Sequence, residues 1–300
     1  MNTRTQSVQH RLLPYYLLTP AFAVLALIIL YPLLSNAIMS LQTVRLLKGT
    51  AWEFIGVAHY QKLLGSRTFR GSVLSSIVFV CVSMPLAFIP SLALALILNE
   101  VRKFRSVITA GLLVPWAISP VVTGYIWRWL FHDSFGMINH FLLQFRLIQQ
   151  PVVWLAQPAA AVFAVCVANA WRFMPYMAIM LLAGLHGISR DLYEAAEVDG
   201  ANAIQRFWHV TLSQLRHVVT VVVLFSLIWM VNDFALIYLM TEGGPANATQ
   251  VLPIAIYRIA FEQLRLGRGA AASMILLVFL LCSSFLFIRV FFQGDRNGET

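Results

Sequence analysis

A polar segment between residues 187 and 217 interrupts a largely apolar sequence. Its distinctive residues are two carboxylates, three alanines, a glycine and an aromatic ring: Glu194, Ala195, Ala196, Asp199, Gly200, Ala201 and Phe207. Alanines let another surface approach closely, and glycine permits a backbone reversal that a Cβ would resist. The acids can cap helix ends or accept hydrogen bonds from a partner. The pattern suits a docking surface, although a solvated connecting helix fits these residues equally well.

The segment itself is prone to form helices. Good helix formers run from Leu192 to Glu197, and Asp199-Gly200 predicts a turn. A second helical stretch is predicted from Ala201 to about Leu212, where apolar residues recur at near-helical spacing. We expect this stretch to be a short helix at the membrane surface that presents a compact face to a partner.

A second set of polar and aromatic residues lies inside long apolar runs. Its members are Trp116, Ser119, Thr123, Tyr125, Asn169, Trp171, Arg172, Tyr176, Trp229, Asn232 and Asp233. Aromatic faces together with hydrogen-bonding groups suit a sugar, which has apolar C–H faces and many hydroxyls. These residues are therefore candidates for a substrate pathway. Interfacial aromatic belts and helix-joining amides are the competing interpretation.

Arg172 and Asp233 are the clearest charges within those runs. A charge deep in a bilayer costs about 2.5 to 3.5 kcal/mol on insertion scales, so each must face a partner or a watery cavity. Counting along straight helices places the two residues at depths that differ by roughly 10 to 15 Å. This favours separate polar contacts along the pathway and leaves a direct ion pair open.

The elements that position these residues follow from composition. The 300 residues are 60% hydrophobic and 11% charged, against roughly 25% charged in soluble domains. A spanning helix needs roughly 20 apolar residues. Six runs meet that length, at Tyr16–Ile38, Val73–Leu98, Val107–Phe131, Pro158–Leu185, Val218–Met240 and Ala271–Phe292. We therefore expect an all-α integral membrane protein with six transmembrane helices.

Several protein classes are disfavoured. The net charge of +9 is scattered between apolar runs, which favours basic loops beside lipid headgroups over a nucleic-acid partner. The three cysteines lie apart in apolar stretches, and no metal or catalytic motif is recognised. The sequence also lacks the phosphate loop of an ATPase. We expect neither an enzyme nor a resident metal or cofactor.

Topology follows from an even number of spans and from charge. Lys and Arg are shared evenly between the two sides, so their raw count decides nothing. The tight loop Val101–Arg105 carries Arg102, Lys103 and Arg105, and this favours a cytoplasmic location for that loop and for both termini. Prolines in the spans, at Pro85, Pro90, Pro115, Pro120 and Pro175, predict bent helices.

The order of residues in this segment and in several others resembles that of a known protein family. Glu194-Ala-Ala-x-x-Asp-Gly-Ala201, followed by Phe207 and Val210-Thr-Leu212, resembles the EAA loop of permease subunits of binding-protein-dependent ABC importers. Further segments resemble the carbohydrate-uptake branch, which includes the maltose and glycerol-3-phosphate permeases: Phe54–Tyr60, Trp127–Phe131 with Gly136 and Asn139, and Thr241–Pro245 with Thr249, Tyr257 and Phe261. Ser189, Ser213 and His217 stand where family members often have proline.

The resemblance implies a type I ABC importer permease fold with a cytoplasmic coupling helix. Residues 1–15 would be a cytoplasmic segment, 16–292 the six-helix transmembrane domain with its coupling loop at 187–217, and 293–300 a cytoplasmic tail. The implied location is the bacterial cytoplasmic membrane. An outer turn, formed by Gly243, Gly244 and Pro245, would gate the pathway or meet a binding protein. A plain extracellular turn is the alternative.

The resemblance also implies partners. They are a second homologous permease, two copies of a cytoplasmic ATPase that binds ATP and Mg, an extracytoplasmic solute-binding protein and the lipid bilayer. The implied function is import of a sugar or a related polyol or glycerophosphate by alternating access. An ion-coupled secondary transporter is the alternative, although such proteins more often carry internal repeats.

Overall fold

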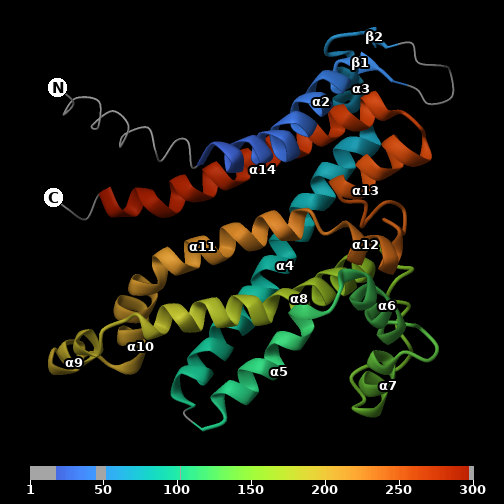
Figure 1. Cartoon of the computed structure of the whole chain (residues 1–300). Coiled ribbons are helices and arrows are strands. Elements are labelled where there is room, and N and C mark those ends of the chain that lie inside the picture. The colour runs from blue at the N-terminus through green and yellow to red at the C-terminus, as the bar shows by residue number, and fades with distance from the viewer. Residues whose placement is uncertain (1–17, 45–51, 102, 297–300) are drawn as a thin grey trace, which may run out of the picture. The chain divides into compact units, whose positions relative to one another are not determined.

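The computed structural model describes residues 18–44, 52–101 and 103–296 (Figure 1). The predicted segment 1–15, the start of the first predicted span and the last four residues of the predicted tail lie outside the described residues. The chain divides into two compact parts, one formed by residues up to Gly65 with Ile256–Ile275, the other by Ser66–Ala255 with the residues from Leu276 onward.

The first part contains the first candidate span, Leu18–Ser40, which includes η1 (Ala26–Leu30) and α2 (Tyr31–Ser40). The antiparallel strands β1 (Gln42–Thr43) and β2 (Glu53–Phe54) follow, and then α3 (Ala58–Gly65). The π-helical turn η3 (Arg258–Glu262), far later in the sequence, also belongs to this part.

Close backbone contact joins sequence-distant segments of this first part. A Cβ on Gly267 would lie 2.1 Å from the Gln42 carbonyl oxygen, so only glycine fits there. The Ser40 hydroxyl lies 2.7 Å from that of Tyr60. The segment between α2 and α4 is therefore packed against the beginning of the last candidate span.

The second part contains most of the remaining helices. They are α4 (Arg67–Glu100), α5 (Arg105–Ala117), α6 (Pro120–Leu130), α7 (Met137–Gln144), α8 (Pro158–His186), α9 (Arg190–Val198), α10 (Ala203–Arg206), η2 (Phe207–Thr211), α11 (Leu212–Val231) and α12 (Phe234–Thr241). Two more, α13 (Leu252–Tyr257) and α14 (Leu266–Arg296), continue across both parts.

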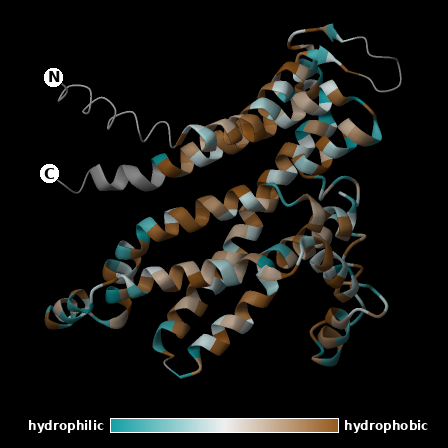
Figure 2. Cartoon of the chain, in the orientation of Figure 1, coloured by the Kyte–Doolittle hydropathy of each residue, from teal (hydrophilic) through white to brown (hydrophobic). Residues whose placement is uncertain are grey.

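Among the described residues, five helices are long and apolar enough to cross a membrane, and the number is six if the pair α5–α6, bent by 90° at its break, is one span. Figure 2 shows the apolar residues along these helices. The six-span expectation agrees with this architecture. The predicted span Val107–Phe131 is divided into two helices at one of its predicted bends, because Pro120 offers no N–H and disfavours helical geometry at Ser119, whose hydroxyl instead caps α6.

The fifth predicted span, Val218–Met240, also has different bounds. Its helix begins much earlier, at Ala203, and ends at Val231. Asn232 and Asp233 break the helix before α12 resumes at Phe234.

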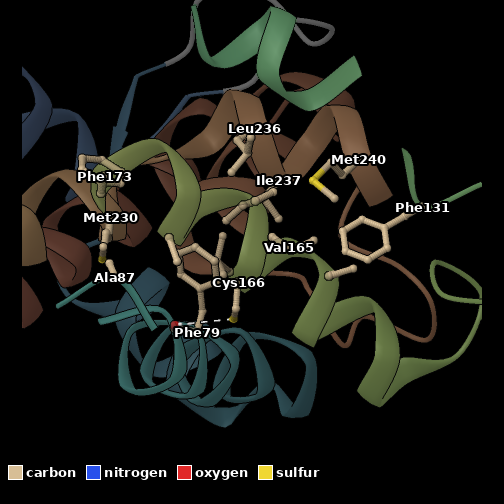
Figure 3. Close-up of a cluster of buried hydrophobic side chains, with 14 of the residues drawn as sticks. Phe79, Ala87, Phe131, Val165, Cys166, Phe173, Met230, Leu236, Ile237 and Met240 are labelled. Carbon is tan, nitrogen blue, oxygen red and sulfur yellow. Dashed lines mark hydrogen bonds between the residues drawn. The ribbon is translucent and has the colours of Figure 1, made fainter. Parts of the chain in front are cut away.

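Helix α8 packs along α4, and the two helices contribute Phe79, Ala87, Val165, Cys166 and Phe173 to the buried cluster of Figure 3. Both helices contribute small residues to this cluster, including Ala87 on α4 and Ala164 and Ala168 on α8, all fully buried. Without water to drive association, close approach of small residues is what packs helices in a membrane. The Ser91 hydroxyl donates to the Met174 carbonyl at 2.9 Å and ties the two helices together.

Candidate functional site

The predicted coupling loop begins where α8 ends, after His186. Ser189 is the N-cap of α9, and its hydroxyl accepts from the Asp191 N–H at 3.3 Å. Gly200 ends the helix in the left-handed region at φ +79°, where a Cβ is strained. Asn202 and Gln205 then form a reciprocal capping box that starts α10.

Two expectations for this loop need correction. Glu194 does not cap a helix end; its carboxylate pairs with Arg190 one turn earlier, at 3.2 Å. Asp199 stands at the C-cap of α9, where its backbone N–H donates to the Ala195 carbonyl, and the side-chain caps come from Ser189 and Asn202. The stretch from Ala201 is also not a short surface helix, because the helix that begins at Ala203 runs unbroken to Val231.

Hydrophilic and hydrophobic residues alternate along the loop (Figure 2), and many of both kinds are exposed. Glu194, Ala195 and Gly200 are exposed, and Phe207 is partly buried in η2. A cavity of about 350 Å³ lies between α9 and the start of the long helix, lined by Ala196, Asp199, Gly200, Ala201, Gln205, Arg206, His209 and Val210. Most of the predicted docking residues therefore lie together on one surface, and Gln205, Arg206 and His209 are lining residues that the sequence reasoning missed.

A buried polar centre joins α8 to the break after α11. The Asp233 carboxylate oxygen Oδ2 accepts from Asn169 Nδ2 and from an Arg172 guanidinium nitrogen, each at 2.9 Å. The Asp233 side chain is 4% exposed and that of Arg172 16%. Asn169 is fully buried. The two charges thus satisfy one another in a region where an unpaired charge would be costly.

The expectation of separate contacts for Arg172 and Asp233 is therefore wrong. The depth count treated Val218–Met240 as one straight helix, whereas α11 ends at Val231 and Asp233 has non-helical angles of φ −76° and ψ 78°. The break lets the carboxylate turn toward α8.

A row of aromatic rings lies beside this centre. Trp116 of α5 stacks on Tyr176 of α8 with ring centroids 6.0 Å apart, and Tyr176 lies 5.2 Å from Trp229 of α11. Both tryptophans are 39% exposed. The row combines apolar ring faces, a phenol and nearby hydrogen-bonding groups, which suits a polyhydroxylated ligand.

The other candidate pathway residues are not part of this cluster. Thr123 is fully buried and donates to the Ser119 carbonyl within its own helix. Asn232 is exposed, and its amide donates to the Ile228 carbonyl of α11. Tyr125 is 58% exposed. The polar groups of Ser119, Thr123 and Asn232 thus serve helix ends and turns.

The predicted outer turn is anchored to α4. Gly243 is buried at φ +85°, and a Cβ there would meet Ile254 at 3.1 Å. Thr249 donates to the Gly244 carbonyl at 2.7 Å. Beyond the turn, Gln250 donates to the Ser72 hydroxyl at 2.9 Å, and the Leu252 N–H donates to that of Ser76 at 2.8 Å. Ser72 and Ser76 had no distinguishing signal in the sequence.

Comparison with known proteins agrees with this architecture. The fold matches the crystal structure of a bacterial ABC transporter involved in the import of alginate, with a TM-score of 0.79 at 22% identity over 97% of this chain and 98% of that chain. A second structure of a bacterial alginate ABC transporter, in complex with an alginate pentasaccharide-bound periplasmic protein, also gives a TM-score of 0.79 at 22% identity, over 95% of this chain and 96% of that chain. The fold class is therefore that of an ABC importer permease.

The family follows from sequence. Residues 62–295 match the family model described as binding-protein-dependent transport system inner membrane component, and the chain belongs to this family. It is 33% identical to the sulfoquinovosyl glycerol transport system permease protein SmoG of Agrobacterium fabrum, over 98% of this chain and 94% of the relative. It is also 33% identical to the trehalose/maltose transport system permease protein MalF of Thermococcus litoralis, over 96% and 97%.

Membership defines the chain as an inner-membrane permease component of a binding-protein-dependent ABC importer. The curated relatives named above are sugar transport permeases. The family gives no support to the ion-coupled secondary transporter that the residues alone left open.

Proposed function

We propose that this chain is one permease half of an importer that carries a sugar, or a related polyol or glycerophosphate, by alternating access. The observation that carries the substrate class is the row Trp116, Tyr176 and Trp229, partly exposed beside the Asn169–Arg172–Asp233 centre. The named cargoes of two relatives, sulfoquinovosyl glycerol and trehalose or maltose, support the same class.

The coupling loop, residues 187–217, would dock on a cytoplasmic ATPase. Its exposed small residues and its cavity support this role, since a partner surface can approach them without displacing a long side chain. The loop also joins α8 directly to the long helix Ala203–Val231. Any movement of the loop would therefore reach two spans at once.

The complete importer would contain a second homologous permease, two copies of the ATPase and a solute-binding protein outside the membrane. ATP and Mg would be bound by the ATPase, and this chain would supply the pathway. The outer turn at Gly243, Gly244 and Pro245, held on α4, would lie at the opposite end from the coupling loop and meet the binding protein or gate the pathway.

Both termini, residues 1–15 and 293–300, would be cytoplasmic, flanking the 16–292 transmembrane domain. A single cysteine at Ser106, in a background without Cys81, Cys166 and Cys282, tests this topology. In whole cells it should resist an impermeant maleimide and react after permeabilisation. Labelling in intact cells would overturn the proposed orientation.

The substrate class is tested through the binding protein encoded with this chain. Thermal-shift screening of that protein against sugars, polyols and glycerophosphodiesters should give a stabilising ligand, and the complex in proteoliposomes should import it in an ATP-dependent way. Uptake driven by an ion gradient without ATP would overturn the proposed mechanism. Stabilisation only by amino acids or metal ions would overturn the substrate class.

A further inference from the structure

One continuous helix connects the coupling loop to the buried polar centre. It runs from Ala203 to Val231 through α10, η2 and α11. At 1.5 Å per residue, these 29 residues span roughly 43 Å. Asp233 follows two residues after the end of this helix. The surface proposed to meet the ATPase lies at the start of this helix, and Asp233 follows its other end. Figure 1 shows the helix as α10 and α11 between α9 and α12.

The helix on the other side of the loop carries the partners of Asp233. Helix α8 ends at His186, just before the loop, and holds Asn169 and Arg172 farther from that end. We call the contact of Asp233 with Asn169 and Arg172 the latch. The loop therefore connects two helices, and the latch joins the far end of the long helix to the middle of α8.

A second contact holds the same two helices near the loop. A Cβ on Gly184 of α8 would lie 2.8 Å from Leu215 Cδ2 and 2.9 Å from Val218 Cγ2. The helices touch there through a bare glycine, so the contact depends on shape and tolerates small rotations. The latch, by contrast, consists of charge-assisted hydrogen bonds of definite length, which are either formed or broken.

We propose that the latch restrains the long helix, and so keeps ATP hydrolysis by the partner ATPase low until solute is delivered. A shift of the coupling loop that pivots the helices about Gly184 must pull Asp233 away from α8. If moving the loop opens the latch, then opening the latch makes the loop easier to move, because coupling between two sites is reciprocal. This inference rests on the proposed function, since it needs an ATPase bound at the loop.

The test uses the complete importer, purified through a tag on this chain and placed in vesicles of phosphatidylethanolamine and phosphatidylglycerol. Replacing one charge alone would leave the other buried without its partner and could prevent folding. The main variant is therefore the double substitution Arg172→Met with Asp233→Asn, which removes both charges at similar volume. The control is Ser226→Ala in α11, because the Ser226 hydroxyl is buried and has no hydrogen-bond partner among the described residues.

The measured quantity is the ATP hydrolysis rate without the binding protein. We expect the double variant to assemble and to hydrolyse ATP about fivefold faster than the wild type or more, at the lower end of typical couplings between sites. Ser226→Ala should keep the wild-type rate. An assembled double variant with an unchanged or lower rate would overturn the latch. Failure of any ATPase to co-purify with the wild type would instead overturn the proposed function.

Discussion

The coupling loop and the latch are two polar regions of an otherwise apolar chain, and they satisfy their polar groups in different ways. In the loop, Glu194 is 63% exposed and its ion pair with Arg190 stays on one helix. In the latch, Asp233 is 4% exposed and its partners come from another helix. The loop leaves its polar groups accessible to a partner, whereas the polar groups of the latch bond to one another within the chain.

Because of this difference, we expect mutations in the loop and mutations in the latch to have different effects. A change in the loop should alter what the chain binds, since water or a partner can satisfy the altered group. A change in the latch should alter the chain itself, since lipid cannot satisfy an orphaned charge. Four variants test this separation, in order of decreasing effect.

The largest effect is expected from Arg172→Ala. It leaves the Asp233 carboxylate buried without its charge partner, and breaking a buried ion pair in this way costs about 3 to 5 kcal/mol. The thermal unfolding temperature of the detergent-solubilised complex should fall, and uptake should be lost. Arg172→Lys, which keeps the charge, should recover part of both. Full uptake by the alanine variant would show that transport does not need the Arg172–Asp233 ion pair.

A smaller loss of stability is expected from Gly184→Val. The added Cβ would meet Leu215 and Val218 below 3.0 Å, and overpacking of this kind costs about 1 to 3 kcal/mol. The unfolding temperature should fall, as in the latch variant. Gly111→Ala in α5 is the matched control, because nothing lies within 4 Å of the position that its added methyl group would take. Equal stability of the two variants would contradict the close helix contact.

The third variant, Gly200→Val, should weaken ATPase binding with little loss of stability, unlike the two variants above. The left-handed backbone at φ +79° costs a residue with Cβ about 1 to 2 kcal/mol, but nothing lies within 4 Å to clash. The chain should still insert in the membrane, with an unfolding temperature close to that of the wild type, while ATPase co-purification drops. Normal transport by this variant would exclude the loop as the ATPase contact.

The smallest effect is expected from Ser189→Ala. It removes the N-cap of α9, a loss of about 1 kcal/mol confined to one exposed helix. ATPase association, measured by co-purification at increasing detergent stringency, should weaken by a few-fold with no change in the basal hydrolysis rate per complex. Ser189→Asp, which can also cap, should behave like the wild type. A raised basal rate in Ser189→Ala would mean that the cap of α9, and not only the latch, restrains ATP hydrolysis.

Several features follow from the sequence by itself. The length and apolarity of six runs predict the spans, because crossing hydrocarbon demands a minimum length of apolar helix. The Glu194–Ala201 pattern predicts a docking loop, because its signal is local: small residues, acids and a glycine at a turn within eight consecutive positions. Gly200 takes the left-handed conformation that a turn after α9 requires.

The contact between Arg172 and Asp233 could be determined only from the tertiary structure. Arg172 and Asp233 are 61 residues apart, and their meeting depends on where α11 breaks, a choice that local propensity does not fix. The same holds for Gly184 against Leu215, and for Ser72 and Ser76 beneath the outer turn, whose residue types are common in packed membrane helices. Contacts between helices depend on where each helix bends and which helix it packs against. Neither can be predicted from the residues near one position in the sequence.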